Sequence, residues 1–205
     1  MSDRRQPGVR RQPSQGRRGW WPLLAIAGLA VLVVGGLVWV SQAAPGPSGV
    51  EVPSTGNVKG DPSAPVVVEE WGDFQCPACR QHALGPGRQL DETFVAEGTV
   101  RVVWRHMAFL GPESLWAAEA SECAAEQGQF WAYHDKLFAE QSGENRGTFS
   151  KENLKRFASE LGLDRQQFDA CFDSGRYTQK VQAEIEAGER KGVRATPTMF
   201  VNGRK

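Results

Sequence analysis

The feature that most constrains this chain is an apolar segment near its N-terminus. No charged residue occurs between Trp20 and Val40, and residues 23–40 are 18 consecutive uncharged positions. At about 1.5 Å per residue, a helix of that length spans roughly 27 Å, which is close to the hydrocarbon thickness of a bilayer. No face of such a helix would be polar, which argues against a helix packed on a soluble core. We therefore expect residues 20–40 to form a transmembrane anchor.

Charge is distributed unevenly on the two sides of this segment. Residues 1–18 contain six Arg and one Asp, whereas the rest of the chain has 18 basic and 23 acidic residues. Positive charge before a span favours a cytoplasmic N-terminus. We therefore expect residues 1–19 to be a basic cytoplasmic tail and the main domain to lie outside the membrane. The alternative is a cleaved signal peptide, because Ser41-Gln42-Ala43 is a tolerable cleavage site. The apolar stretch is, however, longer than the usual apolar region of a signal peptide.

The rest of the chain divides into a tether and a folded domain. Residues 41–62 are rich in Pro, Gly and Ser and have no hydrophobic period, which predicts an irregular tether. The domain is expected over residues 63–205. Its acidic balance argues against nucleic-acid binding.

The start of the domain has the pattern of an α/β fold. β-branched runs occupy residues 65–71 and 99–104 and predict two strands. A helical pattern lies between them, from residue 76 to 96, with a break at Gly85-Pro86-Gly87. A strand, a helix and a second strand imply a parallel pair of strands.

A helical insertion is expected over about residues 111–191, followed by a third strand at 198–201. The expected helices cover residues 113–138 with a break near Gly128, begin again at caps on Ser150 and Asp164, and end with a helix that carries Tyr177, Val181 and Ile185. The third strand is followed by Asn202-Gly203, a strong hairpin signal, with only Arg204 and Lys205 after it. We therefore expect a truncated sequence in which a C-terminal strand and helix are missing.

The motif with the most specific chemistry is Cys76-Pro77-Ala78-Cys79. It follows a predicted strand and starts a predicted helix, where free N–H groups and the helix dipole stabilise a thiolate at Cys76. Cys76 would be the exposed nucleophile in thiol–disulfide exchange, and Cys79, one turn further, would resolve the mixed disulfide. A lone CxxC also occurs in zinc sites and in inert structural disulfides. Since no second CxxC or close Cys/His pair accompanies it, we expect neither a metal nor a cofactor.

Residues 58–205 resemble the DsbA-like branch of the thioredoxin-fold superfamily. The resemblance is carried by Gly60-Asp61-Pro62, Ala64-Pro65-Val66, Glu70, Asp73-Phe74-Gln75-Cys76-Pro77, Cys79, Glu122-Cys123-Ala124, Gln127, Phe130-Trp131, Gly192-Val193, Thr196-Pro197-Thr198 and Phe200-Val201-Asn202-Gly203. It implies a thioredoxin-like fold with a helical insertion and the activity of a thiol-disulfide oxidoreductase.

The resemblance also implies roles for particular residues. Pro197 matches the family's cis-proline, which packs beside the CxxC and presents backbone groups to an extended substrate chain, and Thr196 would flank the disulfide. Together with Pro77 and Ala78, these residues are expected to bind substrate. Glu70 matches the family's buried acid beneath the resolving cysteine, where it would accept the proton of Cys79; a surface glutamate at a strand end is the alternative.

Two further cysteines lie on predicted helices of the insertion. Several proteins of the family carry a second disulfide there, which implies a structural bond between Cys123 and Cys171. Such a bond would close a loop of about 48 residues and contribute on the order of 4 kcal/mol. The alternative is a pair of buried free thiols. The three histidines do not cluster in the sequence, and His82 is expected to be solvated on its helix.

The resulting hypothesis is an exported, membrane-anchored enzyme that oxidises the thiols of secreted or envelope proteins. A membrane quinone-linked partner would reoxidise the Cys76–Cys79 pair. The Pro-Ala dipeptide leaves the direction of electron flow open, since it lacks a histidine that would stabilise the thiolate further. The alternatives are an exported reductase or isomerase of disulfides, and a non-catalytic anchored binding or holdase module.

Overall fold

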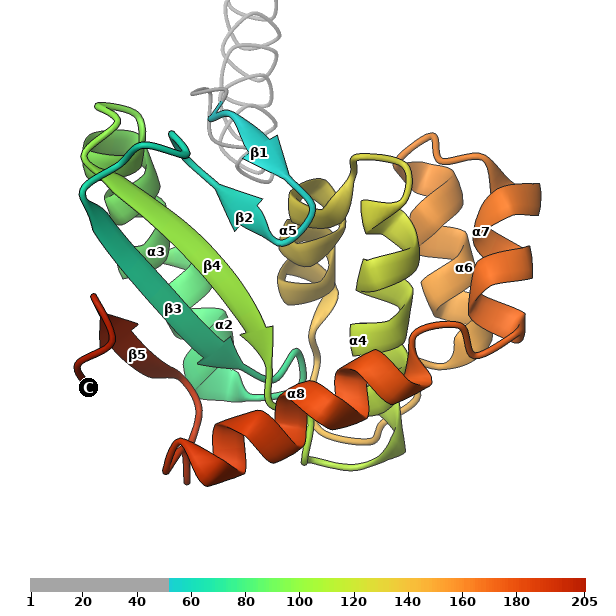
Figure 1. Ribbon diagram of the computed structural model, residues 1–205. Helices are drawn as coiled ribbons and strands as arrows, with labels where there is room; N and C mark the ends of the chain where they lie inside the picture. Colours follow the sequence, from blue (N-terminus) through green and yellow to red (C-terminus); the bar gives the residue numbers. More distant parts are fainter. Residues whose placement is uncertain (1–51) are drawn as a thin grey trace, which may run out of the picture. The chain divides into compact units, whose positions relative to one another are not determined.

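A five-stranded sheet forms the frame of the computed structural model, which describes residues 52–205 (Figure 1). The strands are ordered β1-β2-β4-β3-β5, with bounds β1 Ser54–Thr55, β2 Val58–Lys59, β3 Val66–Gly72, β4 Val100–His106 and β5 Thr198–Val201. β3 and β4 run parallel, with Val66 opposite Val100 and Gly72 opposite His106. This confirms the parallel pair that the sequence predicted. β5 lies antiparallel to β3 on its other side.

The first two strands correct the predicted extent of the tether. β1 and β2 form a hairpin inside the segment 41–62, and β2 pairs with β4. Gly56 turns the chain with φ +56°, which glycine adopts without steric cost. Asn57 then exchanges hydrogen bonds with the backbone of Trp104, 47 residues away. Strands of two residues show no periodicity and their partner β4 is distant in sequence, so the segment has the local pattern of a linker although it pairs in the sheet.

The two faces of the sheet are covered by different helices. Along β3, alternate side chains point to opposite faces. Val68 packs with Val95 and Leu90 of the segment between β3 and β4, whereas Trp71 packs with Ile185 of the helix that precedes β5. Helices therefore cover both faces of the sheet at β3 and β4.

The segment between β3 and β4 contains three short helical elements: α2 (Pro77–Leu84), α3 (Pro86–Leu90) and a π-helical turn, η1 (Asp91–Val95). The break between α2 and α3 falls at Gly85 and Pro86, as predicted. α2 begins directly after Cys76, because Pro77 lacks the N–H that the helix interior would need but the first turn does not.

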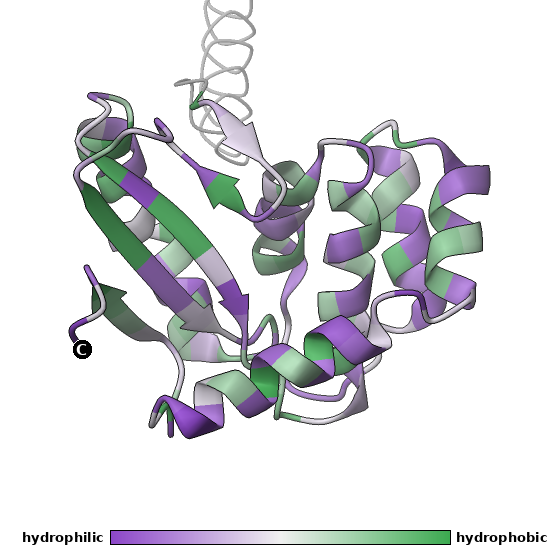
Figure 2. Ribbon diagram, in the orientation of Figure 1, coloured by the Kyte–Doolittle hydropathy of each residue, from purple (hydrophilic) through white to green (hydrophobic). Residues whose placement is uncertain are grey.

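The predicted helical insertion is confirmed between β4 and β5. It comprises α4 (Pro112–Ala125), α5 (Phe130–Glu140), α6 (Lys151–Glu160), α7 (Arg165–Asp173) and α8 (Thr178–Arg190). Ser150 and Asp164 cap α6 and α7 by accepting hydrogen bonds from backbone N–H groups at 3.4 and 2.9 Å. α6, α7 and α8 carry both hydrophobic and hydrophilic residues (Figure 2), and each buries one face. α4 is more deeply enclosed, with nine of its 14 residues buried.

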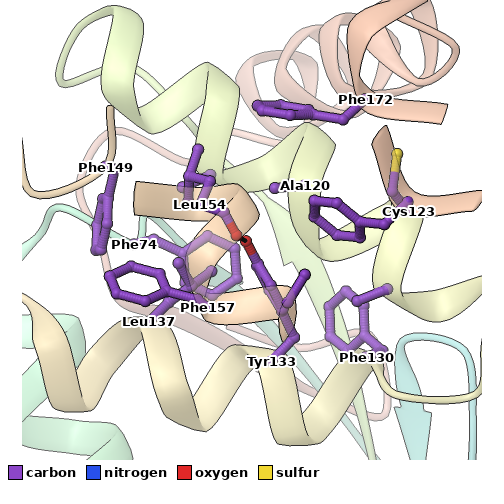
Figure 3. Packing of buried hydrophobic residues seen from close by; sticks show 14 of the residues in the cluster. Phe74, Ala120, Cys123, Phe130, Tyr133, Leu137, Phe149, Leu154, Phe157 and Phe172 are labelled. Carbon is purple, nitrogen blue, oxygen red and sulfur yellow. Dashed lines mark hydrogen bonds between the residues drawn. The ribbon is translucent and has the colours of Figure 1, made fainter. Parts of the chain in front are cut away.

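The largest core lies among α4, α5, α6 and α7. Figure 3 shows Tyr133 and Leu154 meeting in this core, where the Tyr133 hydroxyl donates a 2.8 Å hydrogen bond to the Leu154 carbonyl. Phe74, just before Cys76, reaches the same core and stacks on Trp104 of β4 with ring centroids 5.0 Å apart. The CxxC segment is therefore held where the sheet meets the helical block.

None of the helices described within residues 52–205 is long and apolar enough to cross a membrane. The predicted cytoplasmic tail and the predicted anchor at residues 20–40 lie outside the described residues.

Candidate active site

The two cysteines of the CxxC motif lie at the N-terminus of α2, as predicted. Cys76 is the N-cap residue, and its sulfur accepts a hydrogen bond from the backbone N–H of Cys79 at 3.5 Å. Both are free thiols in this structure. A sulfur in the N-cap position interacts with the free N–H groups and the positive end of the helix dipole.

This position makes the two thiols chemically unequal. The pKa of Cys76 is lowered from 9.0 to about 6, first by a hydrogen bond from the Cys79 thiol and then by Thr196 and the N–H groups of Cys79 and Ala78, while partial burial opposes the shift. The pKa of Cys79 is raised far above its ordinary value, because its hydrogen bond to Cys76 and its burial both favour the thiol. At neutral pH the pair therefore holds a thiolate at Cys76 and a thiol at Cys79.

Cys76 is less accessible than expected. It is 7% exposed, and Cys79 is fully buried. The order of accessibility agrees with the predicted roles, but the description of Cys76 as an exposed nucleophile is wrong. The loop before β5 lies against it, with the Thr196 carbonyl oxygen 3.3 Å from the Cys76 sulfur.

The Thr196–Pro197 loop is brought to the motif across 120 residues of sequence. The peptide bond between Thr196 and Pro197 is cis, as the resemblance implied. Both residues are partly exposed, and Pro77 and Ala78 are exposed on the other side of Cys76. The residues expected to bind substrate are therefore accessible next to Cys76 in sequence and, through the Thr196 carbonyl, next to its sulfur in space.

A buried hydrogen-bond network, which the sequence did not predict, holds the segment that directly precedes Cys76. The Asp73 carboxylate accepts hydrogen bonds from the Ser114 hydroxyl at 2.6 Å and from the N–H groups of Gln75, Phe109 and Leu110. Burial raises the pKa of Asp73, and these hydrogen bonds oppose that shift. Asp73 is part of the motif that carries the family resemblance, but Ser114, Phe109 and Leu110 lie 36 to 41 residues away, and no local pattern identifies them.

Glu70 lies on the face of β3 that is covered by α2 and α3. It is 7% exposed, and burial raises its pKa to about 7, with the Lys59 charge opposing and the Asp91 charge supporting the shift. This confirms a buried acid rather than a surface glutamate. No hydrogen bond joins Glu70 to Cys79 among the described residues. Its Oε2 atom lies 3.7 Å from Nε2 of His82.

The expectation that His82 is solvated is therefore wrong. Its side chain is only 21% exposed. Burial lowers its pKa, and the charges of Lys59 and His134 act in the same direction. His82 and His134, which are far apart in the sequence, thus meet the same group of buried charges around Glu70.

The second pair of cysteines forms a disulfide. Cys123 on α4 is bonded to Cys171 on α7, with Cα atoms 5.8 Å apart and 48 residues between them in sequence. Both residues are buried in the core of the helical block. The predicted pairing is confirmed, and the alternative of two free thiols is excluded.

Comparisons with known proteins agree with this geometry. Residues 53–205 match a family model described as Thioredoxin. The curated relatives include the Na(+)/H(+) antiporter NhaA 3 of Salinispora tropica, which is 37% identical over 155 residues covering 75% of this chain, and the Na(+)/H(+) antiporter NhaA 1 of a Mycobacterium species, 34% identical over 177 residues covering 82%. The chain spans only 22% and 27% of the length of these two relatives.

Solved structures show the same fold. Oxidised BdbD from Bacillus subtilis has a TM-score of 0.68 and 26% identity, with 76% of this chain and 86% of BdbD covered. A thioredoxin-like oxidoreductase from Silicibacter pomeroyi has a TM-score of 0.59 and 29% identity, covering 70% and 78%. The α-DsbA1 of Wolbachia pipientis, at 21% identity and a TM-score of 0.64, shares the fold over 75% of this chain and 78% of its own. The match over residues 53–205 shows that the chain belongs to the thioredoxin family.

Proposed function

We propose that this enzyme oxidises the thiols of exported proteins. The observation that carries the proposal is the inequality of the two thiols, with the pKa of Cys76 lowered to about 6 and that of Cys79 raised. A stabilised thiolate lowers the free energy of the reduced pair relative to its disulfide, and this makes the disulfide a stronger oxidant.

In the proposed reaction, a substrate thiolate attacks the Cys76 sulfur of the Cys76–Cys79 disulfide. The bond between the two cysteines breaks, Cys79 leaves as a thiolate, and a mixed disulfide joins the substrate to Cys76. A second substrate thiolate then attacks the substrate sulfur of the mixed disulfide and releases Cys76 as its stable thiolate. The substrate loses two electrons in forming its disulfide, and the enzyme gains them. The exposed edge formed by Pro77, Ala78, Thr196 and Pro197 would hold the substrate chain in line with Cys76.

Cys79 must gain a proton when it leaves and lose it when the pair is reoxidised. Glu70 is the proposed partner for this proton, because burial brings its pKa to about 7, where it can both give and accept a proton at neutral pH. Since no hydrogen bond connects the two side chains, the proton would pass between them through water.

The proposed site of action is outside the membrane. The arginines at residues 1–18 and the apolar segment 20–40 support a single-pass anchor with a cytoplasmic N-terminus. A membrane quinone-linked protein would reoxidise Cys76 and Cys79.

The reduction potential of Cys76–Cys79 tests the direction of electron flow. The full chain is equilibrated with glutathione and its thiols are trapped, with Cys123 and Cys171 counted separately. Thioredoxin, with a cysteine pKa of about 7, lies near −270 mV, and DsbA, with about 3.5, lies near −120 mV. We expect a value between the two, and a value at or below about −270 mV would indicate a reductase instead.

A substitution separates catalysis from simple binding. Cys76→Ser removes the nucleophile while keeping a small polar N-cap. We expect thiol exchange to be lost and the fold to be kept. If the variant protects unfolded proteins from aggregation as well as the wild type does, and the wild type oxidises no substrate, the chain is a holdase.

A further inference from the structure

Buried polar atoms without partners converge on one small cavity near Glu70. The cavity has a volume of about 20 Å³ and is lined by residues of β2, β3, α2, α3, η1 and α5. Within residues 52–205, Glu70 Oε1, Asp91 Oδ1 and His134 Nε2 are buried without a hydrogen-bond partner, and all three residues line this cavity. A cavity of this size accommodates one water molecule, and a buried water typically makes three hydrogen bonds.

The protonation of His134 suits it to bind such a water. Its Nδ1 lies 2.8 Å from Asp135 Oδ1. An ionised carboxylate only accepts hydrogen bonds, so Nδ1 carries the hydrogen and Nε2 is left with a free lone pair. Burial lowers the pKa of His134, which keeps the ring neutral at neutral pH. A water in the cavity could therefore donate to His134 Nε2 and to Asp91 Oδ1, and accept from a protonated Glu70.

Asp135 connects this arrangement to solvent. It follows His134 directly on α5, yet its side chain is 53% exposed, whereas that of His134 is 4% exposed. A continuous series of groups thus leads from buried Glu70 to bulk water, through the cavity, the two nitrogens of one imidazole and an exposed carboxylate.

We propose that Glu70 exchanges its proton with solvent through a water in this cavity, His134 and Asp135. The Glu70 proton moves to the water while the water gives one of its own to His134 Nε2; the Nδ1 proton passes to Asp135 and from there to solvent. One proton leaves Glu70 and one reaches solvent. The reverse transfer restores the first tautomer of the ring, and a redox cycle needs both directions, because Cys79 gains a proton in one half and loses it in the other.

The charged groups around the cavity are compatible with this route. Lys59 of β2 forms an ion pair with the other oxygen of Asp91 and favours the ionised form of Glu70. Arg88 of α3 lines the cavity beside Asp135. His82 of α2 is the competing exit, but its nitrogen is 3.7 Å from Glu70, beyond a hydrogen bond.

The inference rests on the proposed role of Glu70, and its test reads the exchange of Glu70 directly rather than through thiol chemistry. The full chain is jumped from about pH 5, where Glu70 is protonated, to about pH 9. Loss of its carboxyl C=O band, assigned by its absence in Glu70→Gln, is followed by time-resolved infrared absorption. Asp135→Asn keeps an oxygen that can accept from Nδ1 but cannot take up a proton at these pH values. We expect exchange in this variant to be at least about tenfold slower, as for the loss of a positioned proton-transfer group.

Three further variants complete the test. His134→Phe keeps the ring within its aromatic surroundings and should slow the exchange as much. Asp135→Glu keeps a carboxylate at this position and should exchange the Glu70 proton at about the wild-type rate. Glu140→Gln changes another carboxylate of α5, which pairs with Lys136 away from the cavity, and should leave the rate unchanged. If His134→Phe does not fold, Asp135→Asn decides alone. If Glu70 in Asp135→Asn loses its proton at the wild-type rate, the proposed route is wrong. This holds whether or not His82→Gln, which tests the competing exit, slows the loss of that proton. If Glu70→Gln exchanges thiols as fast as the wild type, the proposed catalytic role of Glu70 fails. This result is independent of the proton route through His134.

Discussion

The acidity of Cys76 is predicted to depend mainly on Cys79. The hydrogen bond from the Cys79 thiol is the largest of the contributions that lower the pKa of Cys76 from 9.0 to about 6. Cys79→Ala removes that donor and leaves the helix N-terminus and Thr196 in place. We expect the pKa of Cys76 to rise by at least half of the shift, to above about 7.5, which corresponds to a loss of about 2 kcal/mol of thiolate stabilisation.

The assay is the ultraviolet absorbance of the thiolate as a function of pH. Because Cys123 and Cys171 are bonded to each other, Cys76 is the one titrating thiol of the variant among the described residues. At pH 7 the thiolate fraction should fall from roughly 90% to about a quarter or less. Cys79→Ser is the matched control, since its hydroxyl can still donate to the sulfur. A pKa that stays at about 6 in Cys79→Ala would refute the reasoning and assign the acidity to the helix N-terminus instead.

Three other predictions follow from the buried groups. Replacing both Cys123 and Cys171 by Ser should lower the free energy of unfolding in urea by about 4 kcal/mol, given the 48-residue loop; an unchanged value would show that packing alone holds α4 and α7. The pKa of Glu70 is raised from 4.5 to about 7 by burial, so the unfolded state loses this proton first as pH rises, and the group's contribution to stability should fall by about 3 kcal/mol between those values. Glu70→Gln should therefore stabilise the protein at pH 8 but not at pH 4. Equal effects at both pH values would contradict a raised pKa of Glu70 in the folded protein. A methyl group at Gly72 would collide with the fully buried ring of Trp104, so Gly72→Ala should cost about 1–3 kcal/mol in thermal or urea unfolding, and a neutral substitution would mean that the ring can move.

Much of the fold could be read from local sequence patterns. The β-branched run at residues 65–71, the Gly-Pro-Gly break after α2 and the caps at Ser150 and Asp164 each depend on residues within a turn or two of chain. The hairpin of β1 and β2 could not be predicted this way. Its two-residue strands are stabilised by pairing with β4 and by Asn57, whose partner Trp104 lies 47 residues further along.

The same division holds for the active site. The place of Cys76 at the start of α2 follows from a strand, a proline and a helix that are consecutive in sequence. The contact of the Cys76 sulfur with Thr196 and three of the four hydrogen bonds of Asp73 involve residues that are 36 to 120 positions away. The family resemblance indicated Pro197 and Glu70, but not the surroundings that raise the pKa of Glu70.

The sequence by itself determined the parallel strand pair, the helical insertion and the CxxC at a helix N-terminus, because periodicity, capping and turn chemistry act between neighbours. Only the tertiary structure decided which groups surround the reactive sulfur and the buried acid. Glu70, His82, Asp91 and His134 come from four different elements, and no pattern within any one of them indicates the others. Burial then makes their charges interact strongly, since the interior screens charge far less than water does.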